Sequence, residues 1–329
     1  MAERDGFMIV YVTRKLLLTI PLLWGVITLI FILVQLSPGD ATDRFFTPET
    51  PPEVRAMVME KWGLDQPVGV QYIRMLTNLL SGEFGYSIPQ ERPVFEIIGE
   101  KLPNTIQLSL VTLFFLMGTG VMLGLSQAVR QYSWWDNIVS VVSLFFYSMP
   151  TFWLALVLIL LFAVKMEALP IAGMTDPVMH AMMTPTEQLW DRLVHMVLPG
   201  AALGIAGAAG IARYTRASML EVVQKDYVRT ARAKGAAERV VITRHALRNA
   251  LLPIITLFGL NLPFLFSGSV LVEYIFGWPG MGRVIVDAIF QQDTPLIIAC
   301  FFVYTLLVVG GNLIADLLYL LVDPRIRLR

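Results

Sequence analysis

The chain has 329 residues, of which 56% are apolar and only 15% are charged, and its mean hydropathy is +0.66. Soluble domains carry about 25% charged residues, so this composition excludes an ordinary soluble protein and indicates a membrane protein. The formal net charge is zero, which excludes a general attraction to polyanions. Cys300 is the single cysteine, so an intrachain disulfide and a cysteine-rich metal site are also excluded.

The first predicted element is a membrane-spanning helix over residues 16–36, directly after Arg14 and Lys15. A helix of about 21 residues crosses a hydrocarbon layer of about 30 Å. The stretch is longer than the apolar part of a signal peptide, and no small-residue cleavage site follows it. We therefore expect a retained span, preceded by a short N-terminal segment over residues 1–15.

The loop over residues 37–103 is predicted to be helical and to face outward. An amphipathic stretch runs from Pro67 to Gly82 and places four apolar residues at helical spacing. These residues are Val70, Ile73, Leu76 and Leu80. A further short helix is expected over 93–102, before the second span. The loop is either a compact packing element or a docking surface for a soluble partner.

Five further apolar stretches are long enough to cross a membrane. They lie at about 104–128, 137–164, 194–216, 251–275 and 295–321. With the first span they give six crossings, so both termini lie on the same side. The expected fold is an all-α membrane protein of six transmembrane helices, with a helical outer-face insertion between the first two, a core over 104–321 and a tail over 322–329.

The distribution of Lys and Arg predicts which side holds the termini, because cytoplasmic segments are enriched in both residues. Sixteen of the 25 lie on the side of the termini, and nine of those sixteen fall between Arg213 and Arg248. Six of the nine on the other side lie in the long loop, where the rule counts weakly. Both termini and the basic segment are therefore predicted to be cytoplasmic.

Glycine spacing bears on helix packing. Gly120 and Gly124 are four residues apart, as are Gly200 and Gly204, and Gly207 and Gly210 follow the second pair. Small residues at this spacing let two helices approach closely. The spacing indicates close packing, either within the chain, which we favour, or against another chain.

The sequence lacks the motifs of several kinds of enzyme. No Lys follows a Gly, so the phosphate-binding loop GxxxxGK[ST] is absent. His180, His195 and His245 form no HExxH motif and no closely spaced ligand pair. We expect no catalytic site and no metal or cofactor bound by this chain. An intramembrane enzyme and an ion-coupled secondary transporter remain as alternatives from other functional classes.

A few polar residues fall within the predicted spans, where they either line a wet pathway or bond between helices. The neutral ones are Ser143, Ser148, Asn261, Ser267, Ser269 and Asn312. Glu273 lies near the outer end of the fifth span, where a carboxylate can reach water. It is the strongest candidate for the outer mouth of a pathway.

The loop at about 217–250 is unlike the rest of the chain, because seven Lys or Arg residues lie between 225 and 253. If a helix runs from Leu220 to Gly235, it has one apolar and one cationic face. The apolar face holds Leu220, Val223, Tyr227 and Ala231, and the cationic face holds Lys225, Arg229 and Arg232. A second helical stretch follows Gly235, with Arg244 and Arg248 one turn apart.

Three interpretations of this segment compete. The cations satisfy the preference for positive charge on the inside and contact anionic lipid, but this leaves the two-faced helix unexplained. Nucleic-acid binding is disfavoured, since a segment tied to the membrane at both ends has little freedom to follow a duplex. The third interpretation is a docking helix for a cytoplasmic partner that supplies energy.

The segment Asp226-Tyr227-Val228-Arg229-Thr230-Ala231-Arg232-Ala233-Lys234-Gly235 resembles the coupling loop of peptide-class ABC importer permeases. The likeness to this dipeptide, oligopeptide and nickel family runs nearly end to end, and the long outer loop is similar to the B-type permease. Other landmarks are Ser37-Pro38-Gly39-Asp40, Gly82-Glu83-Phe84-Gly85, Ser148-Met149-Pro150, Phe276-Gly277-Trp278-Pro279-Gly280 and Asp323-Pro324-Arg325. Arg229-Thr230-Ala231 replaces the acidic start of the general importer motif, so a contact through Glu is impossible here.

The resemblance implies a type I importer permease in the bacterial inner membrane, which pairs with a second homologous permease. Two cytoplasmic ATPase subunits would bind ATP and Mg, and a periplasmic or lipid-anchored protein would deliver a di- or oligopeptide. Nickel chelates, opines, glutathione and oligosaccharides are the alternative cargoes. The residues expected to couple to the ATPases are Val223, Tyr227, Arg229, Ala231, Arg232, Gly235, Arg244 and Arg248.

Overall fold

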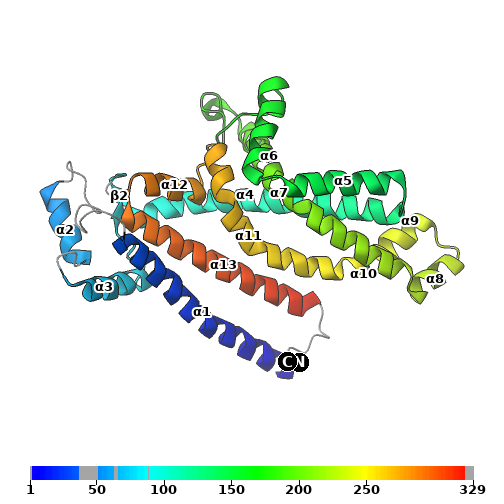
Figure 1. Ribbon diagram of the computed structural model, residues 1–329, viewed down its shortest axis with the longest axis horizontal. Coiled ribbons are helices and arrows are strands. Elements are labelled where there is room, and N and C mark those ends of the chain that lie inside the picture. Colours follow the sequence, from blue (N-terminus) through cyan, green and yellow to red (C-terminus); the bar gives the residue numbers. More distant parts are fainter. Residues whose placement is uncertain (1, 37–50, 63–65, 88, 323–329) are drawn as a thin grey trace. The chain divides into compact units, whose positions relative to one another are not determined.

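The structure is a computed structural model that describes residues 2–36, 51–62, 66–87 and 89–322. At some of these positions, chiefly 2–12, 259–269 and 316–322, it describes the backbone only. It is built almost wholly of helices (Figure 1). The chain divides into two compact units, each described by itself. The first comprises residues 1–105 and 279–313, and the second comprises 106–278 and 314–329.

The first unit combines the N-terminal helices with two helices from near the C-terminus. Its elements are α1 (Ala2–Leu36), α2 (Pro52–Trp62), α3 (Val68–Leu80), β1 (Tyr86–Ser87), β2 (Arg92–Pro93), the start of α4 (Val94–Val129), α12 (Met281–Phe290) and most of α13 (Thr294–Val322). The two short strands pair antiparallel, with Ser87 opposite Arg92. The buried core joins three helices: Ile27 and Ile30 of α1, Met75 and Leu79 of α3, and Ile298 and Phe302 of α13.

The predicted outer-loop helix from Pro67 to Gly82 is present as α3, but its buried face differs from the expected one. Val70, Ile73 and Leu80 are exposed. The residues that pack inward are Gln71, Met75 and Leu79. The choice of face was wrong because hydropathy alone ranked Ile73 above Gln71. The amide of Gln71 is instead held inside by bonds with Gln35 and the carbonyl of Gln66.

The predicted short helix at 93–102 is not separate from the second span. A single helix, α4, runs from Val94 to Val129 and contains Pro103. Proline removes one backbone hydrogen bond, and a long helix that is packed along its length can tolerate that loss. The expected boundary between outer loop and core at residues 103 and 104 therefore falls inside a continuous helix.

The second unit contains the rest of α4 and the helices up to α11. Its elements are α5 (Trp134–Ser148), α6 (Thr151–Leu158), the π-helical turn Ile159–Lys165, the 3-10 turn His180–Met182, α7 (Pro185–Val223), α8 (Asp226–Ala233), α9 (Glu238–Val240), the π-helical turn Val241–Leu247, α10 (Arg248–Ala250) and α11 (Leu252–Ile275). α5, α6 and α11 all pack against α7. α8 and α9 lie beyond the end of α7 (Figure 1).

The predicted third span at 137–164 is not one straight helix. α5 and the segment Thr151–Lys165 are bent by 107° at the break between them. Met149 there has an extended backbone, with ψ 135°. The cause is Pro150, whose ring disfavours helical geometry in the residue before it. The predicted third span therefore contains a sharp bend at Pro150, and its crossing of the membrane as one span stays a prediction.

Four helical stretches of the described chain are long and apolar enough to span a membrane: Thr13–Leu33, Val94–Val129, Pro185–Val223 and Thr294–Ala315. The bent pair brings the number to five. The expected span at 251–275 falls on α11, where half of the side chains lie outside the description. The number of six crossings therefore stays a prediction.

The glycine pairs are used for packing within the chain. A Cβ built at Gly124 would lie 2.3 Å from the carbonyl oxygen of Ala212, and one at Gly204 would lie 2.8 Å from that of Thr112. Both distances are far below van der Waals contact, so the backbones of α4 and α7 approach where only glycine fits. The intrachain explanation that we favoured is thereby confirmed for these pairs.

Candidate functional site: the loop between α7 and α11

The basic loop is not the uninterrupted helix expected from Leu220, because the chain turns back on itself. We call the connecting segment 224–251, between α7 and α11, the hook. α7 ends at Val223, and Lys225 is extended, with ψ 147°. α8 begins at Asp226 and runs to Ala233. The break was not predicted because the local sequence holds neither Gly nor Pro.

The predicted stop at Gly235 is confirmed. Its φ is +79°, a conformation that costs residues other than glycine about 1–2 kcal/mol. The amide of Gly235 donates to the carbonyl of Arg232, and that of Ala236 donates to Ala231, at 2.9 and 3.3 Å. These two bonds form a Schellman cap, which turns the chain back toward α7.

The hook has its own hydrophobic core. The buried residues come from both sides of the break: Met219 and Val222 of α7, Val228 and Ala231 of α8, and Val241, Ala246 and Ala250 of the returning segment. Val228 is fully buried and Ala231 is 8% exposed. Ala231 thus belongs to the inner face, and the expectation that it faces a partner was wrong. The loop and the last turns of α7 form one packed body.

Tyr227 lies at the edge of this core, one helical turn before Ala231 on α8. It is 43% exposed, and its hydroxyl accepts a hydrogen bond of 2.9 Å from the amide of Asn249. Val223, the third apolar residue predicted to contact a partner, packs against the core and is half-buried. The exposed face of α8 therefore presents Tyr227 together with Arg229 and Thr230, and we call these three residues the outer face of α8.

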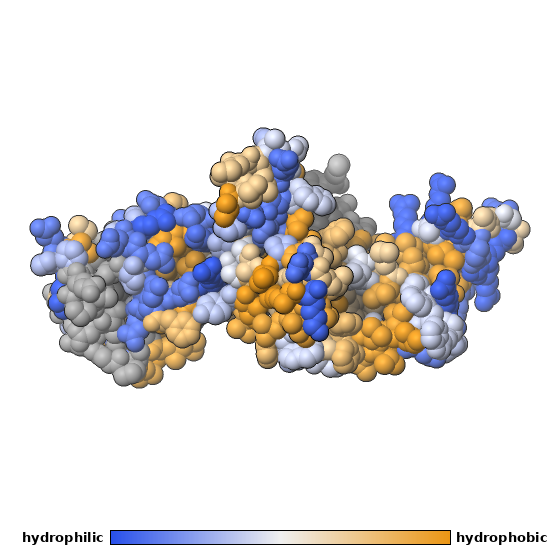
Figure 2. All heavy atoms as spheres, turned by 90° about the horizontal axis from the view of Figure 1, so that it is seen from above, coloured by the Kyte–Doolittle hydropathy of each residue, from blue (hydrophilic) through white to orange (hydrophobic). Residues whose placement is uncertain are grey.

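The cations around α8 have acidic neighbours within the loop. Lys225 pairs with Glu221 at 2.9 Å, Arg229 lies 3.8 Å from Asp226, and Arg232 pairs with Glu238 at 2.7 Å. The guanidinium of Arg232 holds the pKa of Glu238 below its usual range. Arg244 and Arg248 are exposed on the returning segment. Hydrophilic residues accordingly gather at the end of the molecule that holds α8 and α9 (Figure 2).

The predicted pathway residues whose side chains the structure describes belong to both units. Ser143 lines a cavity of about 360 Å³ between α5 and α7. Asn312 lines a separate cavity of about 200 Å³ in the first unit, beside Lys15 and Thr19. Ser148 is exposed, and its hydroxyl donates to the carbonyl of Leu144 in its own helix. The side chains of Asn261, Ser267 and Ser269 lie outside the description.

Glu273 does not lie at an exposed mouth. Its side chain is fully buried, between Val272 and Phe276, two members of a buried cluster with Ala155 and Leu198. Its backbone carbonyl accepts the amide of Trp278 at 2.8 Å, which caps α11. The expectation that this carboxylate reaches water was wrong, because α6 and α7 cover the end of α11.

Residues 120–328 match the family described as the binding-protein-dependent transport system inner membrane component, and residues 8–109 match its N-terminal part. The chain belongs to this family. It is a membrane permease component of a transport system of that kind, and its resemblance to importer permeases is confirmed.

The permease has close relatives along nearly its whole length. It is 42% identical over 320 residues to the oligopeptide transport system permease protein AppB of Bacillus subtilis, covering 97% of this chain and 99% of AppB. It is 38% identical to the dipeptide transport system permease protein DppB of Alkalihalophilus pseudofirmus, covering 97% and 100%. It is 37% identical to the glutathione transport system permease protein GsiC of Salmonella typhimurium, covering 97% and 99%.

An ion pair that the sequence did not predict joins two helices of the permease. Arg216 of α7 donates from Nε and Nη2 to the two carboxylate oxygens of Asp136 on α5, at 2.9 and 2.7 Å. The Asp136 side chain is 3% exposed. The two residues are 80 positions apart, so no local pattern could have joined them.

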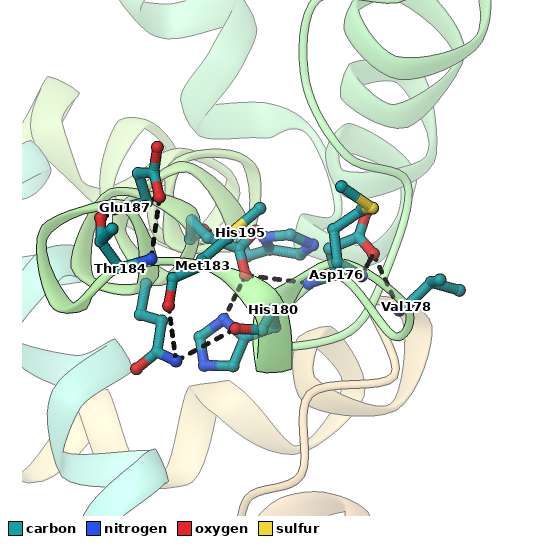
Figure 3. Close-up of polar contacts among 10 residues, drawn as sticks. Asp176, Val178, His180, Met183, Thr184, Glu187 and His195 are labelled. Carbon is teal, nitrogen blue, oxygen red and sulfur yellow. Dashed lines mark hydrogen bonds and ion pairs between the residues drawn. The ribbon is translucent and has the colours of Figure 1, made fainter.

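A second cluster that the sequence did not predict surrounds Asp191 in the permease. The carboxylate of Asp191 lies 2.7 Å from Nδ1 of His180 and 3.1 Å from Nδ1 of His195. It also accepts the amide of Asp176, and Asp176 in turn accepts the amides of Val178 and Met179 (Figure 3). Nδ1 of His195 also lies 2.8 Å from the backbone carbonyl oxygen of Asp191, one turn earlier in α7. The cluster ties the segment before α7 to the first turns of that helix, and the Asp191–His195 spacing of four was its one visible signal.

Proposed function

We propose that the permease forms half of the pathway by which an ATP-driven importer brings di- or oligopeptides into a bacterial cell. A second homologous permease would supply the other half, and a periplasmic or lipid-anchored binding protein would deliver the peptide. Two cytoplasmic ATPase subunits would bind ATP and Mg and hydrolyse the nucleotide. Both termini and the hook would lie on the cytoplasmic side, where cations also meet anionic lipid.

The observation that supports this proposal best is the construction of the hook. Its inner residues, such as Val228, share one buried cluster with Met219 and Val222 of α7. Its outer face presents Tyr227, which the bond from Asn249 holds in place. A partner that grips the outer face and moves would displace the end of α7 with it, because closely packed cores transmit displacement.

The proposed cycle follows from this link. Closure of the ATPase pair around ATP would draw the two hooks together and turn the pathway outward to receive the peptide. Hydrolysis and product release would return the hooks and the pathway to their first state. A ligand can drive such a change only through its different affinity for the two states, and here that ligand is ATP bound by the partners.

Peptides are the proposed cargo because the relatives named above include permeases for oligopeptides and dipeptides. The glutathione permeases are somewhat less similar over the same length. Glutathione is therefore the second candidate, and it is itself peptide-like. Nickel chelates, opines and oligosaccharides remain alternatives, because the binding protein selects much of the cargo in such systems.

The cargo can be tested on the binding protein of this transport system, once its gene is identified. Thermal unfolding of the purified protein would be followed with dipeptides, longer peptides, glutathione, nickel chelates, opines and oligosaccharides at equal concentration. We expect peptides to raise the Tm, since a ligand that binds only the folded state stabilises it by about 2.7 kcal/mol at 100 times its Kd. A shift with glutathione alone, or with a non-peptide alone, would refute the assignment of peptides.

A further inference from the structure

We propose that Asp136 and Arg216 are positioning residues that make α5 move together with α7 and its hook. This inference rests on the proposed function, because it concerns how motion of the hook reaches the spans. It starts from the two parallel hydrogen bonds between these side chains, at 2.9 and 2.7 Å. A bidentate pair of this kind fixes orientation as well as distance.

The carboxylate is held rigidly on its own helix. Ser133 caps α5 by accepting the amide of Asp136 at 3.2 Å. One carboxylate oxygen accepts the amide of Tyr132 at 3.0 Å, and the other lies 3.4 Å from the amide nitrogen of Gln127. The side chain of Asp136 thus joins α5, the preceding turn and α4 before it reaches Arg216. Because the carboxylate is fixed in this way, a displacement of the Arg216 guanidinium should displace α5 as well.

The guanidinium is tied just as closely to the hook. Arg216 precedes Met219 by three residues, within one turn of the same helix, and Met219 is fully buried in the core that α7 shares with α8. Between them, Ser218 donates to the carbonyl of Ala250 at 2.9 Å. The last turns of α7 are therefore fastened to the outgoing and the returning arms of the hook.

Next to the pair, α5 and α7 do not fill the space between them. The cavity of about 360 Å³ opens there, lined from α5 by Ser140 and Ser143 and from α7 by Gly210 and Arg216. Side-chain packing is the ordinary route by which one helix pushes another; α5 and α7 pack elsewhere along their length, but the cavity interrupts that packing beside the pair. The ion pair bridges the two helices at its edge. Motion of the hook then passes through α7 and the pair to α5, and onward to the bend at Pro150.

The test uses the whole importer, with the permease purified in complex with its encoded partners and reconstituted in liposomes. The variants are Asp136→Asn and Arg216→Met, with Asp287→Asn as the matched control. Asp287 is 40% exposed and lies 3.7 Å from Arg283 in α12, so the control removes an exposed paired carboxylate. We expect the two pair variants to hydrolyse ATP within about twofold of the parent but to import about tenfold less peptide per ATP. Transport per ATP within twofold of the parent in both assembled variants would overturn the inference.

A second measurement keeps the inference testable if these variants fail to assemble. Spin labels placed at the exposed positions Val141 of α5 and Tyr214 of α7 report the separation of the two helices in the parent complex, while the buried Cys300 stays unlabelled. We expect one unchanged separation with and without ATP. A change larger than the rise of one helical turn, about 5.4 Å, would show that the two helices move independently and would refute the proposal. A parent complex that imports nothing with ATP would instead refute the proposed function.

Discussion

Arg232 donates two hydrogen bonds to Glu238, at 3.1 and 2.7 Å, and the pair closes the turn at Gly235. The last turn of α8 and the first residue of α9 are thereby joined side chain to side chain. The backbone bonds of the Schellman cap join the last turn of α8 to Gly235 and Ala236. The turn that ends α8 is consequently held by the backbone and by an ion pair.

Glu238→Gln should loosen this turn in a pH-dependent way. Arg232 lowers the pKa of Glu238 in the folded state, so the stabilising effect is complete above the ordinary glutamate pKa, near 4.3. It is lost as the pH falls through the lowered folded-state pKa. Hydrogen exchange at Ala236 should therefore be faster in the variant at pH 7, and the two proteins should converge in acid. Glu221→Gln, which removes the exposed partner of Lys225, is the control; equal exchange at pH 7 in all three proteins would contradict the prediction.

Gly235→Val should disturb coupling without preventing assembly. A Cβ built at Gly235 meets no described atom within 4 Å, so space is not the constraint. The constraint is the φ of +79°, which a β-branched residue tolerates poorly. We expect ATPase activity to persist while uptake per ATP falls severalfold. Gly235→Asn is the matched control, because Asn adopts this conformation more readily. If the valine variant couples as well as the parent, the turn has no role in coupling.

Tyr227→Ala and Val228→Ala should impair different properties of the permease although the residues are adjacent. Val228 is fully buried in the hook, so its truncation should lower the free energy of unfolding by about 2 kcal/mol. Tyr227 is 43% exposed, so its truncation should leave the Tm nearly unchanged and weaken association with the ATPase subunits. Thermal unfolding and co-purification of the ATPases measure the two effects. If the ATPase subunits failed to co-purify with Val228→Ala but still co-purified with Tyr227→Ala, Tyr227 would not be part of the contact with them.

Asp293→Asn should remove one pH-dependent contribution to stability. Asp293 is buried before α13, where it accepts a hydrogen bond from Ser87, and burial raises the pKa of its carboxyl. The folded protein therefore favours the protonated carboxyl of Asp293. This preference stabilises the fold fully at pH values below the ordinary aspartate pKa, near 3.9. That stabilisation is lost as the pH rises through the raised value. The Tm of the variant should depend less on pH between 4 and 7 than that of the parent, with Asp287→Asn behaving like the parent. Identical profiles for Asp293→Asn and the parent would contradict the burial effect.

The sequence predicted those features that depend on local chemistry. Gly235 ended its helix as expected because only glycine adopts its backbone conformation cheaply. The face of α8 was mistaken, since the break at Lys225 has no Gly or Pro signal and changes which residues turn inward. That break put Val228 inside and left Tyr227 outside. The pair of Asp136 and Arg216 depends on tertiary packing across 80 residues, which periodicity cannot reveal.

The central claim is that energy from ATP enters this permease from partner subunits. It is tested most directly by peptide uptake into liposomes that contain the complete complex and its binding protein. We predict uptake when ATP is supplied on the side of the membrane that carries the hook. Ionophores that abolish ion gradients should leave this uptake unchanged. Uptake that proceeds without ATP and stops when an ion gradient is collapsed would contradict it and would indicate a secondary transporter.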